Sequence, residues 1–127
     1  ELSGVARFSS QRLVPYFDRY PVGGAASLRG QDEQAFRVDR YALSRLEWSW
    51  FLGALGERVF VFWDHAVMGT RNGLPAGGDH MDVLQRDGIG FGLRLDTAGG
   101  TIGVDYGLEP GRAPLDGKIH LRLISTF

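Results

Sequence analysis

Alternation of apolar and polar residues over short segments is the feature that most constrains the fold of this chain. Between Gly88 and Thr97 every second residue is large and apolar, and the residues between are mostly glycine or charged. This period of two places the apolar side chains on one face of a β-strand. Alternation is also present at 41–52, 59–67, 101–108 and 118–127, and less clearly at 3–13. No segment keeps helical spacing beyond two turns, so the sequence predicts an all-β protein with six strands.

The connections between the predicted strands alternate in length. A long segment at 14–40 is followed by a short one at 53–58, and a long one at 68–87 by a short turn at 98–100. A medium loop at 109–117 precedes the last strand. Outer-membrane barrels have short periplasmic turns and long extracellular loops. The pattern favours an antiparallel up-and-down transmembrane β-barrel whose C-terminus lies at the periplasmic side, with Trp and Tyr side chains near the membrane interfaces.

Two other fold classes share this alternation. A soluble β-sandwich or soluble up-and-down barrel would turn the same apolar faces to a core. Composition does not separate these classes, because 43% of the residues are hydrophobic and 23% charged. No apolar run is long enough for a membrane helix, and the first residues lack signal-peptide features. The chain is therefore soluble, or meets a membrane as strands, or has its targeting segment outside this sequence. The net charge of −1, without a basic patch, predicts no nucleic-acid partner.

Catalytic and metal sites have little support in the sequence. His65, His80 and His120 share no ligand spacing, and the chain has no cysteine. The glycine-rich run at 88–92 is not followed by a helix that could bind phosphate, and its alternating glycines instead make room on one strand face. No Gly-x-Ser-x-Gly motif is present, and the sequence alone places no Ser, His and Asp together. We expect no enzyme activity, no metal and no cofactor.

A more specific signal lies at 20–30, in the paired glycines Gly23-Gly24, in Ser27 and in the dipeptide Arg29-Gly30. This segment resembles the sixth extracellular loop of the BamA/TamA-like superfamily of outer-membrane assembly and translocation proteins, also called the bacterial surface antigen family. Gln31 stands where that family usually has an aromatic residue. Segments at 44–48, 62–66 and 90–107 resemble later strands of the family in the same order, so the resemblance covers nearly the whole chain.

The resemblance implies that the loop at 14–40 folds back into the barrel. In the family, the arginine of this loop pairs with carboxylates on the inner wall of the barrel. By position, the arginine is Arg29, followed by Gly30, and the carboxylates are Asp64 and Glu47. The alternation independently places Glu47 and Asp64 on one face, opposite to the apolar one. One guanidinium can engage two carboxylates at once. The alternative is that Arg29 is a solvated loop residue and Asp64 a simple pore-lining carboxylate.

The C-terminal residues Leu121, Leu123 and Phe127 resemble the insertion signal of outer-membrane barrels, an amphipathic last strand that ends in an aromatic residue. Ile124 stands where that signal more often has glycine. An edge strand can add to the edge of another sheet, which gives such recognition a physical basis. The alternative is an ordinary terminal strand that ends in Phe.

The resemblance also implies an activity, the insertion of outer-membrane proteins or the translocation of polypeptides by lateral opening of a strand seam. Its partners would be outer-membrane lipid and unfolded client polypeptides. Six strands cannot close a membrane barrel. We therefore expect this chain to supply the last six strands of a sixteen-strand barrel. The other barrel strands, and periplasmic domains, would lie outside this chain. The alternatives are a passive pore or structural barrel and, less favoured, a soluble β-sandwich binding module.

Overall fold

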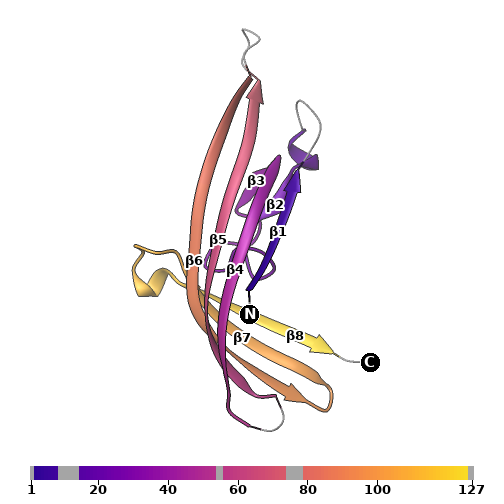
Figure 1. The fold of residues 1–127 in the computed structure, drawn as a ribbon, viewed down its shortest axis with the longest axis vertical. Coiled ribbons are helices and arrows are strands. Elements are labelled where there is room, and N and C mark those ends of the chain that lie inside the picture. Colours follow the sequence, from indigo (N-terminus) through magenta and orange to yellow (C-terminus); the bar gives the residue numbers. More distant parts are fainter. Residues whose placement is uncertain (1, 9–14, 54–55, 74–78, 126–127) are drawn as a thin grey trace.

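The computed structural model describes residues 2–8, 15–53, 56–73 and 79–125 (Figure 1). Regular structure in these residues consists of β-strands and two short 3₁₀ helices, η1 (Tyr16–Asp18) and η2 (Pro114–Asp116). The strands are β1 (Leu2–Phe8), β2 (Tyr20–Val22), β3 (Phe36–Val38), β4 (Arg40–Phe51), β5 (Arg58–Gly73), β6 (Asp79–Thr97), β7 (Gly100–Leu108) and β8 (Lys118–Ser125). The prediction of an all-β fold is confirmed. None of the helices in the described residues is long and apolar enough to cross a membrane.

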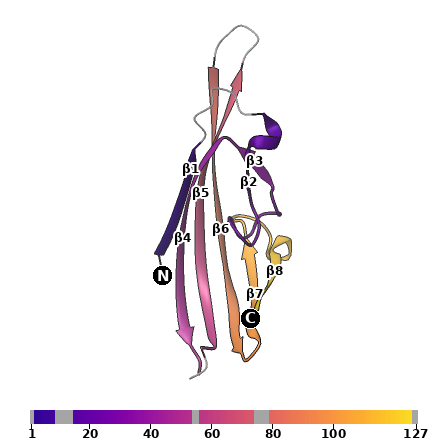
Figure 2. The same ribbon diagram turned by 90° about the vertical axis from the view of Figure 1, so that its right-hand side faces the viewer.

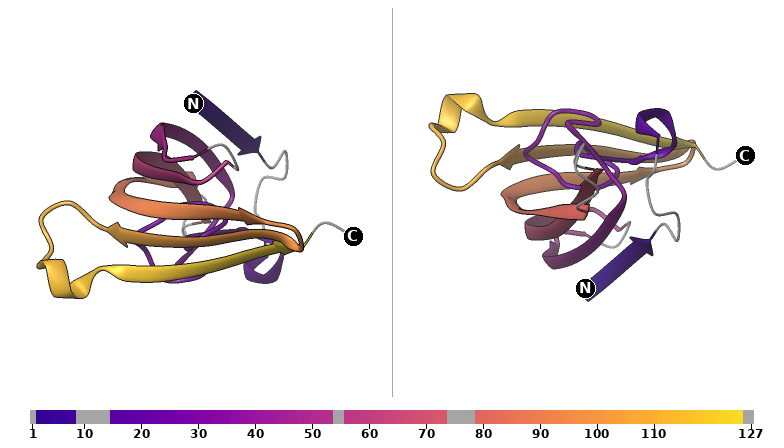
Figure 3. Two further views of the ribbon diagram at one scale, coloured as in Figure 1. Left: turned by 90° about the horizontal axis from the view of Figure 1, so that it is seen from below. Right: turned by 90° about the horizontal axis from the view of Figure 1, so that it is seen from above.

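Six strands form one antiparallel sheet in the order β1-β4-β5-β6-β7-β8. The sheet is long, twisted and curled, and β5 and β6 extend well beyond their neighbours (Figures 1 and 2). The sheet is open, since β1 and β8 are its two ends and do not pair with each other in the described residues. Among the described residues, the short strands β2 and β3 pair with each other and with no other strand, and they lie within the curl of the sheet (Figure 3). We call the side of the sheet that they cover the inner face.

The two faces of the sheet differ in chemistry. The inner face carries the buried side chains, and these include the carboxylates Glu47, Asp64 and Asp105. The opposite, outer face presents large apolar side chains that are exposed: Leu46, Trp48, Trp50, Val61, Trp63, Ile89, Phe91, Leu95, Ile102, Val104, Ile119, Leu121 and Leu123. A sheet of a water-soluble protein normally buries its apolar face and exposes its polar one. Here the arrangement is reversed.

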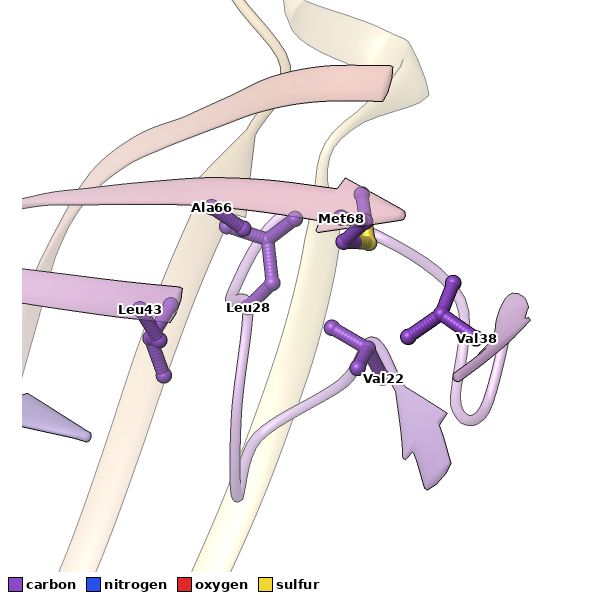
Figure 4. Close-up of a cluster of buried hydrophobic side chains, with 6 residues drawn as sticks. All are labelled: Val22, Leu28, Val38, Leu43, Ala66 and Met68. Atoms are coloured by element: carbon purple, nitrogen blue, oxygen red, sulfur yellow. The ribbon is translucent and has the colours of Figure 1, made fainter. Parts of the chain in front are cut away.

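A small hydrophobic cluster fixes the segment between β1 and β4 to the inner face. Its buried members come in equal number from that segment and from the sheet (Figure 4): Val22, Leu28, Val38, Leu43, Ala66 and Met68. Burying a side chain of the size of Leu28 contributes roughly 1.5–3 kcal/mol. The cluster therefore fixes both ends of the segment to the sheet. The middle of the segment, which contains Arg29, reaches further along the inner face.

Several predicted boundaries are wrong. The segment 14–40 is not a simple loop, because it contains η1, β2 and β3 and because β4 begins at Arg40. The segment predicted as a loop at 68–87 is mostly strand, with β5 continuing to Gly73 and β6 beginning at Asp79. Met68 and Leu84 pack there against the folded-back segment, a second layer that the pattern of a single strand cannot reveal. Strand β1 is described to Phe8, and residues 9–13 of the predicted first strand lie outside the described residues.

Candidate functional site

The segment 23–30 is shaped to bring Arg29 to the inner face. The N–H of Gly23 donates to Ser27 Oγ at 2.8 Å, and the Ser27 hydroxyl donates back to the Gly23 carbonyl at 3.1 Å. Gly30 has φ +90°, and a Cβ there would lie 2.9 Å from the backbone of Leu108. Only glycine adopts this conformation at such close approach without strain. The residues that carry the resemblance at 23–30 are thus the ones that form this turn.

Arg29 is buried in a dense set of charge-assisted hydrogen bonds. Its Nε donates to Asp64 Oδ2 at 2.8 Å and its Nη2 to Asp64 Oδ1 at 2.7 Å. Its Nη1 donates to Glu47 Oε2 at 3.2 Å, and its backbone N–H to Asp64 Oδ2 at 3.2 Å. The side chains of Arg29 and Asp64 are 1% and 0% exposed. Paired, bidentate contacts of this kind are among the strongest that a protein makes.

The surroundings keep Arg29 charged. The guanidinium carbon lies 3.5 Å from the ring centroid of Phe62, a cation–π contact. Burial alone disfavours the charged form, but hydrogen bonds and charge attraction from Asp64 and Glu47 outweigh it and raise the pKa of Arg29. A third carboxylate, Asp105, lies 4.0 Å from Nη1. The loop therefore brings a cation to three carboxylates of the inner face.

Three further arginines of the inner face belong to the site, and sequence reasoning missed them. Arg45 approaches Asp64 Oδ1 at 3.1 Å and donates to the Ser27 carbonyl at 2.7 Å. Arg94 lies 3.5 Å from Asp105. Arg122, on β8, donates to the Ala25 carbonyl at 2.9 Å. The alternation places these three arginines on the polar faces of their strands. It does not indicate which polar side chains reach the loop, because that depends on the curl of the sheet. Strands β4 and β8 therefore both hold the loop.

Glycines on β6 and β7 let the loop lie directly on the sheet. A Cβ at Gly88 would be 1.8 Å from the carbonyl oxygen of Arg29, and a Cβ at Gly107 would be 2.6 Å from the backbone nitrogen of Gly30. Glycine inside a strand often marks such an approach of another backbone. Gly88 and Gly107 thus form the surface on which residues 29 and 30 rest.

The site consists of ion pairs that attach the loop to the sheet. Each carboxylate oxygen of Asp64 accepts hydrogen bonds from cationic groups, so it is poorly placed to act as a general base. The described residues contain no group of three His, Cys, Asp or Glu side chains that could hold a metal ion. Arg29, Gly30, Glu47 and Asp64 are brought together; their role as a loop lock stays a prediction.

The residues of the predicted insertion signal lie elsewhere. Leu121 and Leu123 are on the outer side of β8, at one end of the sheet, and are more than three-quarters exposed, at 79% and 76%. Phe127 lies outside the described residues. Comparison with known proteins adds no relative: no protein-family model, no curated protein and no solved structure matches the chain.

Proposed function

We propose that this chain forms six strands of an outer-membrane β-barrel that inserts outer-membrane proteins or translocates polypeptides. The observation that carries the proposal is the reversed sheet, with an exposed apolar outer face and a charged inner face on which Arg29 pairs with Asp64 and Glu47. Large exposed apolar surfaces mark contact with a membrane or a partner. A polar interior and an apolar exterior are the pattern of transmembrane barrels.

The register of the strands arranges the apolar side chains of the outer face in rows. Four successive rows are apolar: Leu95–Ile102–Leu123, Trp50–Val59–Leu93–Val104–Leu121, Trp48–Val61–Phe91–Tyr106–Ile119 and Leu46–Trp63–Ile89–Leu108. Rows on one face are two residues apart, about 6.7 Å along the strand, so the first and the last of the four rows are about 20 Å apart. At a tilt of about 40° this is about 15 Å along the bilayer normal, which is more than half of the ~25 Å band of outer-membrane barrels.

The next row supports an interface at this level. Ser44, His65 and Asp87 face one another across β4, β5 and β6. Asp87 Oδ1 accepts a hydrogen bond from Trp63 Nε1 at 2.9 Å and lies 2.9 Å from His65 Nδ1. A tryptophan whose indole N–H has a polar partner and whose ring is otherwise in apolar surroundings is typical of the membrane–water boundary. We call this the polar row.

The proposed activity is supported by the resemblance of the Arg29-Gly30 loop, and of the segments that follow it, to the BamA/TamA-like superfamily. The contacts of Arg29, Arg45 and Arg122 tie the loop to β4, β5 and β8 and thereby brace the inner wall. Clients would be unfolded barrel or secreted polypeptides, and the surrounding partner would be lipid. The open sheet needs additional strands to close, because unpaired edges are not tolerated in hydrocarbon.

Reconstitution of the complete protein in vesicles tests this function. We expect it to accelerate folding of a barrel client, followed by the heat-dependent gel mobility of the client. Arg29→Ala should slow that acceleration by about tenfold, which corresponds to about 1.4 kcal/mol. The matched control is Arg112→Ala, since Arg112 is an exposed arginine whose nearest carboxylate is Glu109 in the same loop. Ion conduction without any effect on client folding would support a passive pore and contradict the proposal.

A further inference from the structure

The polar row interrupts an apolar part of the outer face. Across β4, β5 and β6 it places Ser44, His65 and Asp87 side by side, a combination that the sequence alone does not bring together. The rows on both sides of it are apolar in β4 and β5: Leu46–Trp63 and Ala42–Val67. Ionisable side chains on an otherwise apolar face are candidates for a functional site, because packing of the sheet does not require them.

Asp87 holds the imidazole of His65 in one orientation. Asp87 Oδ1 lies 2.9 Å from His65 Nδ1, and the same oxygen accepts the indole N–H of Trp63 at 2.9 Å. Because an ionised carboxylate only accepts hydrogen bonds, the contact places the proton of the neutral imidazole on Nδ1. Within the described part of the chain, Nε2 has no hydrogen-bond partner, and the His65 side chain is 30% exposed. Nε2 is therefore free to accept a proton.

Ser44 stands next to His65 on the side away from Asp87. The two residues are direct partners across β4 and β5, and such pairs have Cβ atoms about 4.5–5.5 Å apart. Ser44 is exposed, and its hydroxyl donates to the carbonyl oxygen of His65 at 3.5 Å, which is a long and weak contact. Rotation about the Cα–Cβ bond turns this hydroxyl toward the imidazole, as catalytic hydrogen bonds often tighten only with substrate. The row thus contains a hydroxyl, a base and an orienting carboxylate in that order.

The side of Ser44 that faces β1 is open. The partner of Ser44 on β1 is Gly4, and a Cβ at Gly4 would have only the carbonyl oxygen of Leu43 within 4 Å, at 3.4 Å. No other described atom would lie so close to such a Cβ. A substrate can therefore approach the Ser44 hydroxyl over β1, on the side opposite to His65.

The level of the polar row selects the substrate, if the membrane location proposed above holds. The apolar rows begin directly beside it, at Leu46 and Trp63, and the Trp63 ring lies 6.1 Å from the His65 ring between centroids. Acyl esters of bilayer lipids have their carbonyl groups where the hydrocarbon core meets the headgroup layer. A lipid whose chains lie along the apolar rows thus presents its ester carbonyl to Ser44.

We infer that Ser44, His65 and Asp87 form a site that hydrolyses acyl esters of membrane lipids. His65 Nε2 takes the hydroxyl proton while Ser44 Oγ bonds to the ester carbonyl carbon. The bond from that carbon to the alcohol oxygen then breaks, and His65 gives the proton to the alcohol. Water attacks the acyl group on Ser44, passes its proton through His65 to Oγ, and the fatty acid leaves. Asp87 is the positioning residue.

The backbone around Ser44 sets the expected rate. At this residue β4 pairs with β1 on one side and with β5 on the other, so the N–H groups of the ladder are engaged and provide no oxyanion hole. Loss of a single oxyanion donor costs about 10²–10³ in rate, whereas a positioned general base supplies about 10²–10⁴. We therefore expect slow hydrolysis of lipids that lie against the outer face, and faster reaction with activated probes.

Covalent labelling of the complete protein in detergent micelles tests the site. The probe is an alkyl fluorophosphonate, with which an activated serine forms an O–P bond and releases fluoride. We expect labelling of Ser44, found by mass spectrometry of peptides, and a decrease of at least about 100-fold in His65→Gln. Asp87→Glu should retain more labelling than Asp87→Asn, because it keeps the carboxylate. Ser49 is the matched control, since it faces Phe60 across the same two strands and should stay unlabelled.

Lipid hydrolysis is measured with the complete protein in phosphatidylglycerol vesicles. We expect release of free fatty acid by the wild type and none by Ser44→Ala, a variant that loses only an exposed hydroxyl and should fold normally. Equal labelling of Ser44 and Ser49, or labelling unchanged in His65→Gln, would overturn the inference. Labelling without release of fatty acid would refute lipid esters as the substrate.

The inference rests on the proposed membrane location but not on the proposed assembly activity. Client folding in the same vesicles reports on that activity separately. Vesicle insertion without labelling of Ser44 would refute the catalytic site alone. Labelling of a protein that does not enter vesicles would refute the membrane location, and with it the assignment to lipid esters.

Discussion

Replacing Asp64 with alanine is expected to lower the free energy of unfolding by about 3–5 kcal/mol, the effect of removing one partner of a buried ion pair. The change deprives Arg29 of its bidentate partner and Arg45 of its nearest carboxylate, while both cations stay on the inner face. Urea unfolding in detergent micelles measures the effect, and limited proteolysis reports whether residues 20–30 become accessible. The additional change Arg29→Ala should restore part of the loss, because the uncompensated buried charge disappears.

The matched control for this prediction is Asp32→Ala. Asp32 pairs with Lys118 at 2.8 Å, but its side chain is 75% exposed, so its loss should change stability by less than about 1 kcal/mol. Equal effects of the Asp64 and Asp32 variants, or additive effects of the Arg29 and Asp64 changes, would show that these residues do not hold the loop.

Gly88→Ala is expected to displace the loop by sterics alone, without any change of charge. The new methyl group would meet the carbonyl oxygen of Arg29 at 1.8 Å, and the backbone on either side leaves no flexible side chain to yield. We expect a loss of about 2–4 kcal/mol, because large effects of single substitutions arise from overpacking and from broken buried networks. Circular dichroism should show the strands intact, while protease cleavage at residues 20–30 increases.

Gly99→Ala controls for the general effect of a glycine replacement. A Cβ at Gly99 has open space around it, with no heavy atom within 4 Å. Its effect should be within about 0.5 kcal/mol, as for other surface positions. A Gly88 variant as stable and as protease-resistant as the Gly99 variant would contradict the close approach of loop and strand.

The sequence allows the strands and their two faces to be predicted well, because a period of two is a local property. The alternation assigns Trp48 and Trp50 to one side and Glu47 and Asp64 to the other, and the structure has the same assignment. The predicted strand boundaries are wrong where a second layer packs on the sheet. Residues 68–73 and 79–87 are strand, and Met68 and Leu84 among them pack against the folded-back segment, a contact that no single-strand pattern contains.

The site could be predicted only in part for a similar reason. The pairing of Arg29 with Glu47 and Asp64 was expected only from the resemblance of the loop to the BamA/TamA-like superfamily, because no local pattern connects residue 29 with residues 47 and 64. Arg122 is 97 residues from Ala25, whose carbonyl it contacts, and only the curl of the sheet brings them together. The outward row Ser44–His65–Asp87 likewise depends on the register of three strands, although each residue was visible in the sequence. The membrane location and the assembly activity stay predictions.

The most direct test of the membrane location uses the three tryptophans, Trp48, Trp50 and Trp63, which all lie on the outer face. Single-tryptophan variants of the complete protein, with the other two replaced by Phe, are reconstituted in vesicles whose acyl chains carry bromine at defined depths. We expect all three to be quenched, Trp63 best by bromine near the headgroups, and Trp48 and Trp50 best by bromine deeper in the chains. Absence of quenching, together with cooperative unfolding as a water-soluble monomer without detergent, would contradict the membrane location.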